Sequence, residues 1–202
     1  MSVQWDRGLR VYVRVDSMWD NRVRGLCGNY NSDMRDDFQT PSGGGVAETS
    51  ALLFADSWKL KTTCPKPQEV TDHCVERPNR KEWASATCGA MKRYPFSLCH
   101  SEVSPSEFVS RCEADACACD SGADCDCACA ALAAYAHACA ARGVTFKWRT
   151  QEMCPMQCDE ECSNYHECIS PCPPETCDNY LDYMKIKAAC EKETCVEGNN
   201  NP

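Results

Sequence analysis

Hydrophobic and polar residues alternate near the beginning of the chain. Between residues 9 and 15, leucine or valine occupies each odd position and arginine or tyrosine each even one. A period of two places successive side chains on opposite faces of a strand, so this segment predicts a β-strand with one buried face. Val3 and Trp5 end a preceding strand, and the residues from Asp6 to Gly8 suit the turn between the two.

A helical pattern replaces this alternation after Cys74 and is clearest over residues 128–142. Nearly every residue there is Ala, Leu, Tyr, His or Cys, and their overall helix propensity is high. Gly143 is well placed as the left-handed residue that ends the helix. Four positions spaced by three or four residues predict one buried stripe: Leu132, Tyr135, Ala136 and Cys139.

A proline-containing linker and a change in periodicity predict several small modules along the chain. Pro65-Lys66-Pro67 favours a stiff linker. We place module boundaries at 1–64, at a linker over 65–73, at 74–158 and at 159–202. Beyond Cys158 the periodicity disappears, so the last module is expected to be rich in loops and shaped by its disulfide bridges.

The cysteine content indicates the compartment in which the protein folds. The chain has 202 residues and 20 cysteines, and Cys27 is the only one before Cys64. At this density disulfides replace part of a hydrophobic core, which indicates a secreted, extracellular and oxidised protein. Met1 leads directly into Ser2-Val3-Gln4-Trp5 without a signal peptide. We therefore expect an internal segment of a longer secreted protein.

Charge and hydropathy exclude several classes of partner. The formal net charge is −9, and residues 64–202 hold 13 basic against 22 acidic side chains. An acidic surface disfavours nucleic acid and anionic membranes as partners. No apolar run approaches the roughly 20 residues that span a bilayer. We expect no nucleic-acid partner and no membrane insertion.

Catalytic motifs are absent from the sequence. No two cysteines have the C-x-x-C spacing of dithiols and zinc ribbons. The sequence also lacks G-x-S-x-G, H-E-x-x-H and a phosphate-binding loop. A Cys–His nucleophile would have to survive among 20 cysteines in an oxidising compartment. We therefore expect no enzymatic activity.

Asn and Asp residues crowd the segment after Cys27. Closely spaced carboxylates and amides supply the oxygen ligands that calcium prefers. By composition alone, such a segment is more often a turn whose side chains cap its own backbone. The candidate ligands are Asn29, Asn31, Asp33, Asp36 and Asp37.

Three cysteines at alternate positions form the sharpest motif of the chain. Cys125, Cys127 and Cys129 cannot easily bridge one another because disulfide geometry is demanding, so each needs a partner elsewhere. Three bridges within the chain satisfy this need.

Several segments together resemble a known family, the von Willebrand factor type D assembly. Residues 25–31, 36–38 and 56–58 look like the C-terminal half of a von Willebrand factor type D (VWD) module. Residues 117–158, with the three alternate cysteines and Trp148-Arg149-Thr150, resemble a C8 module. Residues 168–177 and Cys195-Val196-Glu197-Gly198 look like part of a trypsin-inhibitor-like (TIL) module. The order is that of von Willebrand factor, gel-forming mucins and hemolectin-type proteins.

The resemblance implies a multi-module, disulfide-rich fold. A partial β-sandwich-like VWD module would be followed by a small α-helical C8 module and a loop-rich TIL module. It also implies a structural calcium, bound by side chains at 29, 31, 36 and 37 and by a backbone carbonyl near Asp33 or Met34. One further ligand is expected from the half of the VWD module that this sequence lacks.

The resemblance also assigns roles to individual cysteines. Cys27 and Cys64 would pair with cysteines in the missing half of the VWD module. Cys125, Cys127 and Cys162 match positions that cross-link two copies in multimerising relatives. The TIL pattern departs here, because no cysteine follows Gly198.

These features favour an adhesive or structural fragment of a secreted glycoprotein, joined by disulfides into multimers or gels, as in clotting proteins or mucins. One alternative is a monomeric assembly that binds another extracellular protein. A second is serine protease inhibition by the TIL part, with a reactive loop between Asp178 and Ala189.

Overall fold

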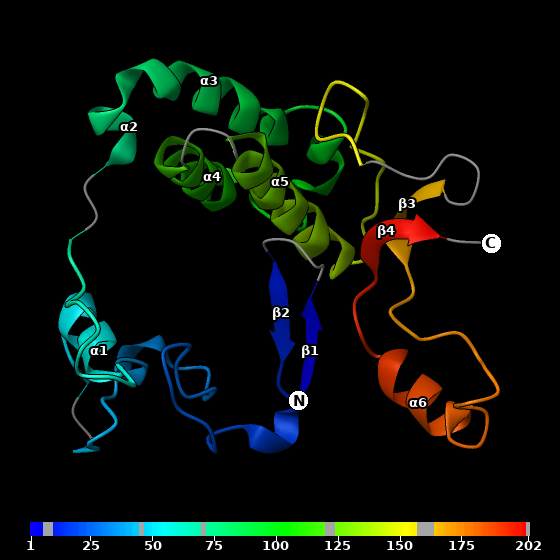
Figure 1. Ribbon diagram of the computed structural model, residues 1–202, viewed down its shortest axis with the longest axis horizontal. Helices are drawn as coiled ribbons and strands as arrows, with labels where there is room; N and C mark the ends of the chain where they lie inside the picture. The colour runs from blue at the N-terminus through cyan, green and yellow to red at the C-terminus, as the bar shows by residue number, and fades with distance from the viewer. Residues whose placement is uncertain (6–9, 45–46, 70–71, 120–123, 157–163, 201–202) are drawn as a thin grey trace. The chain divides into compact units, whose positions relative to one another are not determined.

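A computed structural model describes residues 1–5, 10–44, 47–69, 72–119, 124–156 and 164–200 (Figure 1). The chain divides into two compact units, Met1–Thr71 and Asp72–Pro202, and the division lies inside the linker expected over 65–73. The strands are β1 (Ser2–Trp5), β2 (Val11–Arg14), β3 (Asn164–Ile169) and β4 (Val196–Asn200). The α-helices are α1 (Ala51–Ser57), α2 (His73–Glu76), α3 (Pro78–Cys88), α4 (Ser106–Ala118), α5 (Asp124–Ala140) and α6 (Tyr183–Cys190). The 3-10 helices are η1 (Ser17–Trp19), η2 (Met34–Asp36), η3 (Gly89–Lys92) and η4 (Phe96–Cys99).

The first unit begins with an antiparallel hairpin of β1 and β2. Val3 lies opposite Val13, and Trp5 lies opposite Val11, so these apolar side chains share one face. The predicted alternation is therefore present over Val11–Arg14, whereas Leu9 lies outside the described residues. The predicted burial is not observed, because Trp5 remains 64% exposed and Val13 61% exposed. Within this unit no described element covers that face.

The remainder of the first unit has a small apolar centre. Ser50 caps α1 by accepting a hydrogen bond from the Leu53 backbone N–H. Phe54 on this helix is the one buried hydrophobic residue among the described residues of the unit. Its ring stacks on Phe38, with the centroids 4.6 Å apart. The described residues of this unit show one two-stranded sheet, and the β-sandwich-like form remains a prediction.

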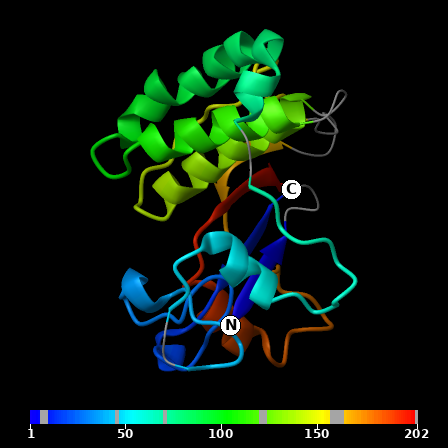
Figure 2. The same ribbon diagram turned by 90° about the vertical axis from the view of Figure 1, so that its left-hand side faces the viewer.

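The second unit is built on helices. Helix α4 packs between α3 and α5, and the three lie side by side in both views (Figures 1 and 2). Five disulfides fasten this helical part: Cys74–Cys117, Cys88–Cys112, Cys99–Cys139, Cys119–Cys127 and Cys129–Cys154. The fold is thus disulfide-rich and mainly helical here, as the cysteine density and the helical pattern predicted.

An aromatic cluster fills the core between the helices. Phe96 is fully buried, and its ring centroid lies 6.1 Å from Tyr135, 5.3 Å from Phe146 and 5.5 Å from Trp148. The Tyr135 hydroxyl donates a 2.7 Å hydrogen bond to the Val103 carbonyl. Aromatic side chains bury large apolar areas, so this cluster supplies much of the hydrophobic driving force that the bridges supplement.

Helix α5 confirms the helical pattern and its end. Leu132, Tyr135 and Cys139 are fully buried, and Ala136 is half-buried. Gly143 has φ of 82°, in the left-handed region. The Val144 N–H then bonds to the Cys139 carbonyl at 3.0 Å, and the Gly143 N–H bonds to the Ala140 carbonyl at 2.9 Å. This is the Schellman arrangement that a C′ glycine permits.

The end of the chain is a hairpin and a short helix. Strands β3 and β4 pair antiparallel, with His166 opposite Gly198. Two disulfides, Cys168–Cys195 and Cys172–Cys190, fasten the described residues of this part, and Cys190 is the last residue of α6. In the described part of the chain, no helix is long and apolar enough to cross a membrane.

Candidate functional site

The candidate calcium ligands lie together in a loop that ends in η2. The Asp36 carboxylate accepts hydrogen bonds from the side-chain amides of Asn29, at 3.0 Å, and Asn31, at 3.0 and 3.1 Å. Asp37 accepts the backbone N–H of Asn29 at 3.1 Å. Asn29 is the buried polar residue of this loop. Four of the five predicted side chains are therefore neighbours.

Gly28 allows the close approach of Asp37. Its φ is +90°, and a Cβ built there would lie 2.3 Å from the Asp37 Oδ1 atom. A side chain at this position would both strain the backbone and displace the carboxylate. The glycine after Cys27 thus has a defined role in shaping the loop.

Asp33, the fifth predicted residue, is turned away from this group. Its carboxylate accepts hydrogen bonds from the Arg35 guanidinium at 2.7 and 2.9 Å and from the Arg35 backbone N–H. These bonds, formed first of all with the Arg35 side chain, hold the pKa of Asp33 below its ordinary value. The pair is largely exposed, so it contributes little to stability.

The side-chain oxygens of this loop are of the chemical type that binds a hard cation such as calcium. Asp36 and Asp37 provide carboxylates, and Asn29 and Asn31 provide amide oxygens, which at present accept the backbone N–H groups of Asn31 and Asp33. Among the described residues no three His, Cys, Asp or Glu side chains gather as a metal site, so the amides would have to contribute. A cation beside Asp36 would replace the two amide donors there. The same bonds also fit the self-capping turn that composition alone predicts.

Two of the three alternate cysteines close within the chain. Cys127 is bonded to Cys119, and Cys129 to Cys154. The first bond differs from the interchain role assigned to Cys127. Its physical reason is proximity: α4 and α5 are packed together, and the Cα atoms of Cys119 and Cys127 lie 6.4 Å apart, within reach of a disulfide. The Cys125 side chain and Cys162 lie outside the described residues.

Three described cysteines have no bridge and are exposed: Cys27, Cys64 and Cys177. For Cys27 and Cys64, pairing with cysteines outside this sequence stays a prediction. An exposed thiol in an oxidising compartment would be open to exchange.

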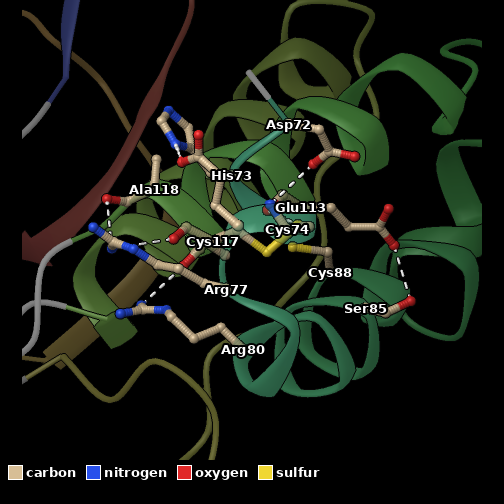
Figure 3. Close-up of a disulfide and its surroundings, with 12 residues drawn as sticks. Asp72, His73, Cys74, Arg77, Arg80, Ser85, Cys88, Glu113, Cys117 and Ala118 are labelled. Carbon is tan, nitrogen blue, oxygen red and sulfur yellow. Dashed lines mark hydrogen bonds and ion pairs between the residues drawn. A yellow bond between two sulfur atoms is a disulfide. The ribbon is translucent and has the colours of Figure 1, made fainter. Parts of the chain in front are cut away.

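Arginines at the start of the helical part hold the end of α4, a feature that the motifs did not predict (Figure 3). The Arg77 guanidinium donates to the carbonyls of Cys117, Ala118 and Cys119, at 3.2 to 3.4 Å. Arg80 donates to the Ala116 carbonyl at 2.9 Å. The last carbonyls of a helix lack partners within it and carry partial negative charge, so two guanidinium groups satisfy and stabilise this end. The Cys74–Cys117 disulfide joins the same two segments.

A buried ion pair links the helical part to the terminal hairpin. Glu197 on β4 accepts hydrogen bonds from Arg149 at 2.7 and 2.9 Å, from the Trp148 indole at 3.1 Å and from the Tyr165 hydroxyl at 3.1 Å. The Arg149 and Glu197 side chains are 11% and 9% exposed. We call these four residues the Glu197 cluster. Burial, and then the negative charge of Glu197, raises the pKa of Tyr165 far above its ordinary value, so its hydroxyl stays a donor.

Both halves of the Glu197 cluster lie inside segments that the family resemblance had already singled out. Trp148-Arg149 belongs to the C8 pattern, and Glu197 to the segment after Cys195. Their pairing was not predicted, because 48 residues separate Arg149 from Glu197. A buried pair of opposite charges leaves no periodic signal in a single sequence.

Two domain families match these two units. Residues 87–155 match the C8 domain, and residues 1–44 match the von Willebrand factor type D domain. The chain therefore belongs to the proteins built from von Willebrand factor type D and C8 domains.

Several relatives align with nearly the whole length of the chain. It is 72% identical to hemocytin of Bombyx mori over 198 residues, 98% of this chain and 6% of that protein. It is 40% identical to SCO-spondin of Gallus gallus over 98% of this chain and 4% of the relative. It is 41% identical to Mucin-5B of Homo sapiens over 89% of this chain and 3% of the relative. The chain thus spans a small fraction of the length of these relatives.

Proposed function

We propose that the chain is a non-catalytic structural and adhesive segment of a larger extracellular protein. The observation that carries this proposal is the covalent framework: seven disulfides lie among the described residues of Asp72–Pro202, five of them around one aromatic core. Disulfides persist in oxidising compartments, and such a framework suits a rigid spacer. Similarity to a hemocytin and to mucins supports the same function.

Within that function, cysteines of this chain would join copies of the parent protein into multimers or gels. Cys125 and Cys162 are the candidates, whereas the Cys119–Cys127 bond leaves Cys127 without a thiol unless it exchanges. Digestion of the native parent protein without reduction, followed by mass spectrometry, tests this. A peptide with Cys125 or Cys162 linked to its own copy is the expected result.

The monomeric alternative is favoured by the Cys119–Cys127 bond itself, because it removes one predicted cross-linking position. If Cys125 and Cys162 also close within one chain, the multimer proposal fails. The chain would then be a monomeric module that binds another extracellular protein. No observation on the described residues favours protease inhibition. Helix α6, Tyr183–Cys190, occupies much of the predicted reactive loop. A helix does not present the extended backbone that would pair with a strand at the protease active site.

We further propose that the loop around Asp36 binds a structural calcium. Asn29, Asn31, Asp36 and Asp37 would hold it, and it would supply only a fixed positive charge that joins them. Because Asp36 contacts both amides, Asp36→Asn should abolish the calcium response of this loop. Isothermal titration with calcium would measure it, and Asp33→Asn is the matched control because Asp33 faces Arg35. Equal binding by the Asp36→Asn variant and the natural chain would remove Asp36 from the site.

A further inference from the structure

In the described part of the chain, no disulfide joins the terminal hairpin to the helical part. Among the described residues, every bridge lies either between Cys74 and Cys154 or between Cys168 and Cys195. None of the described residues of the hairpin is fully buried, and Tyr165, Ile169 and Val196 are half-buried. The Glu197 cluster is therefore the principal described attachment between two separate covalent frameworks.

The contacts of Glu197 require its negative charge. The carboxylate accepts hydrogen bonds from two guanidinium N–H groups, an indole N–H and a phenol hydroxyl. Hydrogen bonds from such donors to an ionised acceptor are about twice as strong as neutral ones. A neutral carboxyl group would leave the buried Arg149 cation without its counter-charge, and that is costly in a site so little exposed.

We propose that Glu197 is an acid-sensitive latch between the C8 domain and the terminal hairpin. In its ionised form it fastens the hairpin to Trp148 and Arg149. When it takes up a proton, the ion pair is lost and the hairpin separates from the helical part. The inference goes beyond the proposed structural function and holds for a monomer as well as for a multimer.

The surrounding charges agree with this assignment. Arg149 also donates to the Cys154 carbonyl at 2.9 Å and lies over the Trp148 ring at 4.3 Å, so it is fixed from the C8 side. Tyr165 stays protonated, and Glu167 on β3 adds a more distant negative charge. His137 lies in the last turn of α5, the helix that contacts β4. A His137→Asn variant therefore separates the contribution of this histidine from that of Glu197.

Nuclear magnetic resonance of the full chain tests the latch directly. The indole N–H signal of Trp148, assigned with Trp148→Phe, reports the bond to Glu197. Because these donors stabilise the ionised form, Glu197 takes up its proton below the ordinary carboxyl range, and this signal should move to the position of an unbonded indole as the pH falls from neutral to about 2. Amide hydrogen exchange at Tyr165 and His166, corrected for its intrinsic pH dependence, should accelerate at least about tenfold.

Two variants separate the latch from general acid sensitivity. Glu197→Gln should show the released indole signal and fast exchange already at neutral pH, with the aromatic core around Phe96 unchanged. Glu167→Gln, the matched control on the exposed side of the hairpin, should follow the natural chain. A Trp148 signal that is constant over this pH range, or a transition that persists in Glu197→Gln, would refute the latch. Loss of the transition in His137→Asn would assign it to the histidine instead and also refute the proposal.

Discussion

The two units of this chain reach order by different means. Among the described residues of Asp72–Pro202, a buried aromatic core and seven disulfides occur together. In Met1–Thr71 the described residues bury one hydrophobic side chain, Phe54, while Cys27 and Cys64 have no bridge. The first unit instead relies on local hydrogen bonds, such as those around Asp36. Covalent and hydrophobic stabilisation are therefore concentrated in the second unit, whereas the described structure of the first unit is held mainly by hydrogen bonds within its loops.

Reduction of the disulfides should lower the stability of the second unit more than any single substitution. Each native bridge in a small domain contributes about 2–5 kcal/mol, so full reduction should unfold the second unit. The first unit has no bridge among its described cysteines, and its amide exchange should remain unchanged. Hydrogen exchange with mass spectrometry before and after reduction measures both units in one sample. Equal loss of protection in both would show that the contrast is false.

A core truncation should reveal the same contrast on a smaller scale. Leu132 is fully buried, so Leu132→Ala should lower the free energy of unfolding by about 2–5 kcal/mol. Leu53 is 60% exposed in the first unit, and Leu53→Ala should change it by no more than about 0.5 kcal/mol. Denaturant titration followed by circular dichroism compares the two. A similar loss in both variants would contradict the burial difference.

The loop of the first unit should be most sensitive at a glycine. Gly28→Ala forces a Cβ into the left-handed region and against Asp37, and we expect a cost of about 1–2 kcal/mol or more within the loop. Gly25→Ala is the matched control, since nothing lies within 4 Å of the Cβ there. Exchange of the Asn29 amide, which bonds to Asp37, reports the damage. Normal protection of that amide in Gly28→Ala would show that the loop adapts.

The smallest effect concerns a single hydrogen bond in the core. Tyr135→Phe removes the donor to the Val103 carbonyl and should cost about 1 kcal/mol. Tyr94 is 80% exposed, and Tyr94→Phe should leave the melting temperature unchanged. Calorimetry of both variants tests this. Indistinguishable melting curves would mean that water replaces the lost hydroxyl.

Local patterns predicted the local elements of this chain. The alternation around Val11 and Val13 and the stripe on α5 both correspond to observed elements, and Gly143 ends the helix as expected. The Asn and Asp residues near Asp36 also cluster as their spacing suggested. These features depend on residues a few positions apart, which a single sequence displays directly.

Features that join distant segments could not be predicted in this way. The alternation did not reveal that Trp5 and Val13 would stay exposed within the unit, because burial depends on what covers a face. Arg77 reaches carbonyls 40 to 42 residues away. The pairing of Cys127 with Cys119 follows from the packing of α4 on α5, which spacing alone left open.

The order of the bridges has a mechanical consequence. A tension applied between residues 74 and 154 would cross the helical part by a covalent shortcut. The tension would pass through three bridges: Cys74–Cys117, Cys119–Cys127 and Cys129–Cys154. Between them the path follows the backbone only across Ala118 and Ala128. Unbridged, this stretch could extend to roughly 280 Å at about 3.5 Å per residue, but the shortcut limits it to a few tens of ångströms. Helix α3 and most of α4 and α5 would carry no tension, because the path crosses only the end of α4 and one turn of α5, so pulling could not unravel these helices while the bridges remain intact.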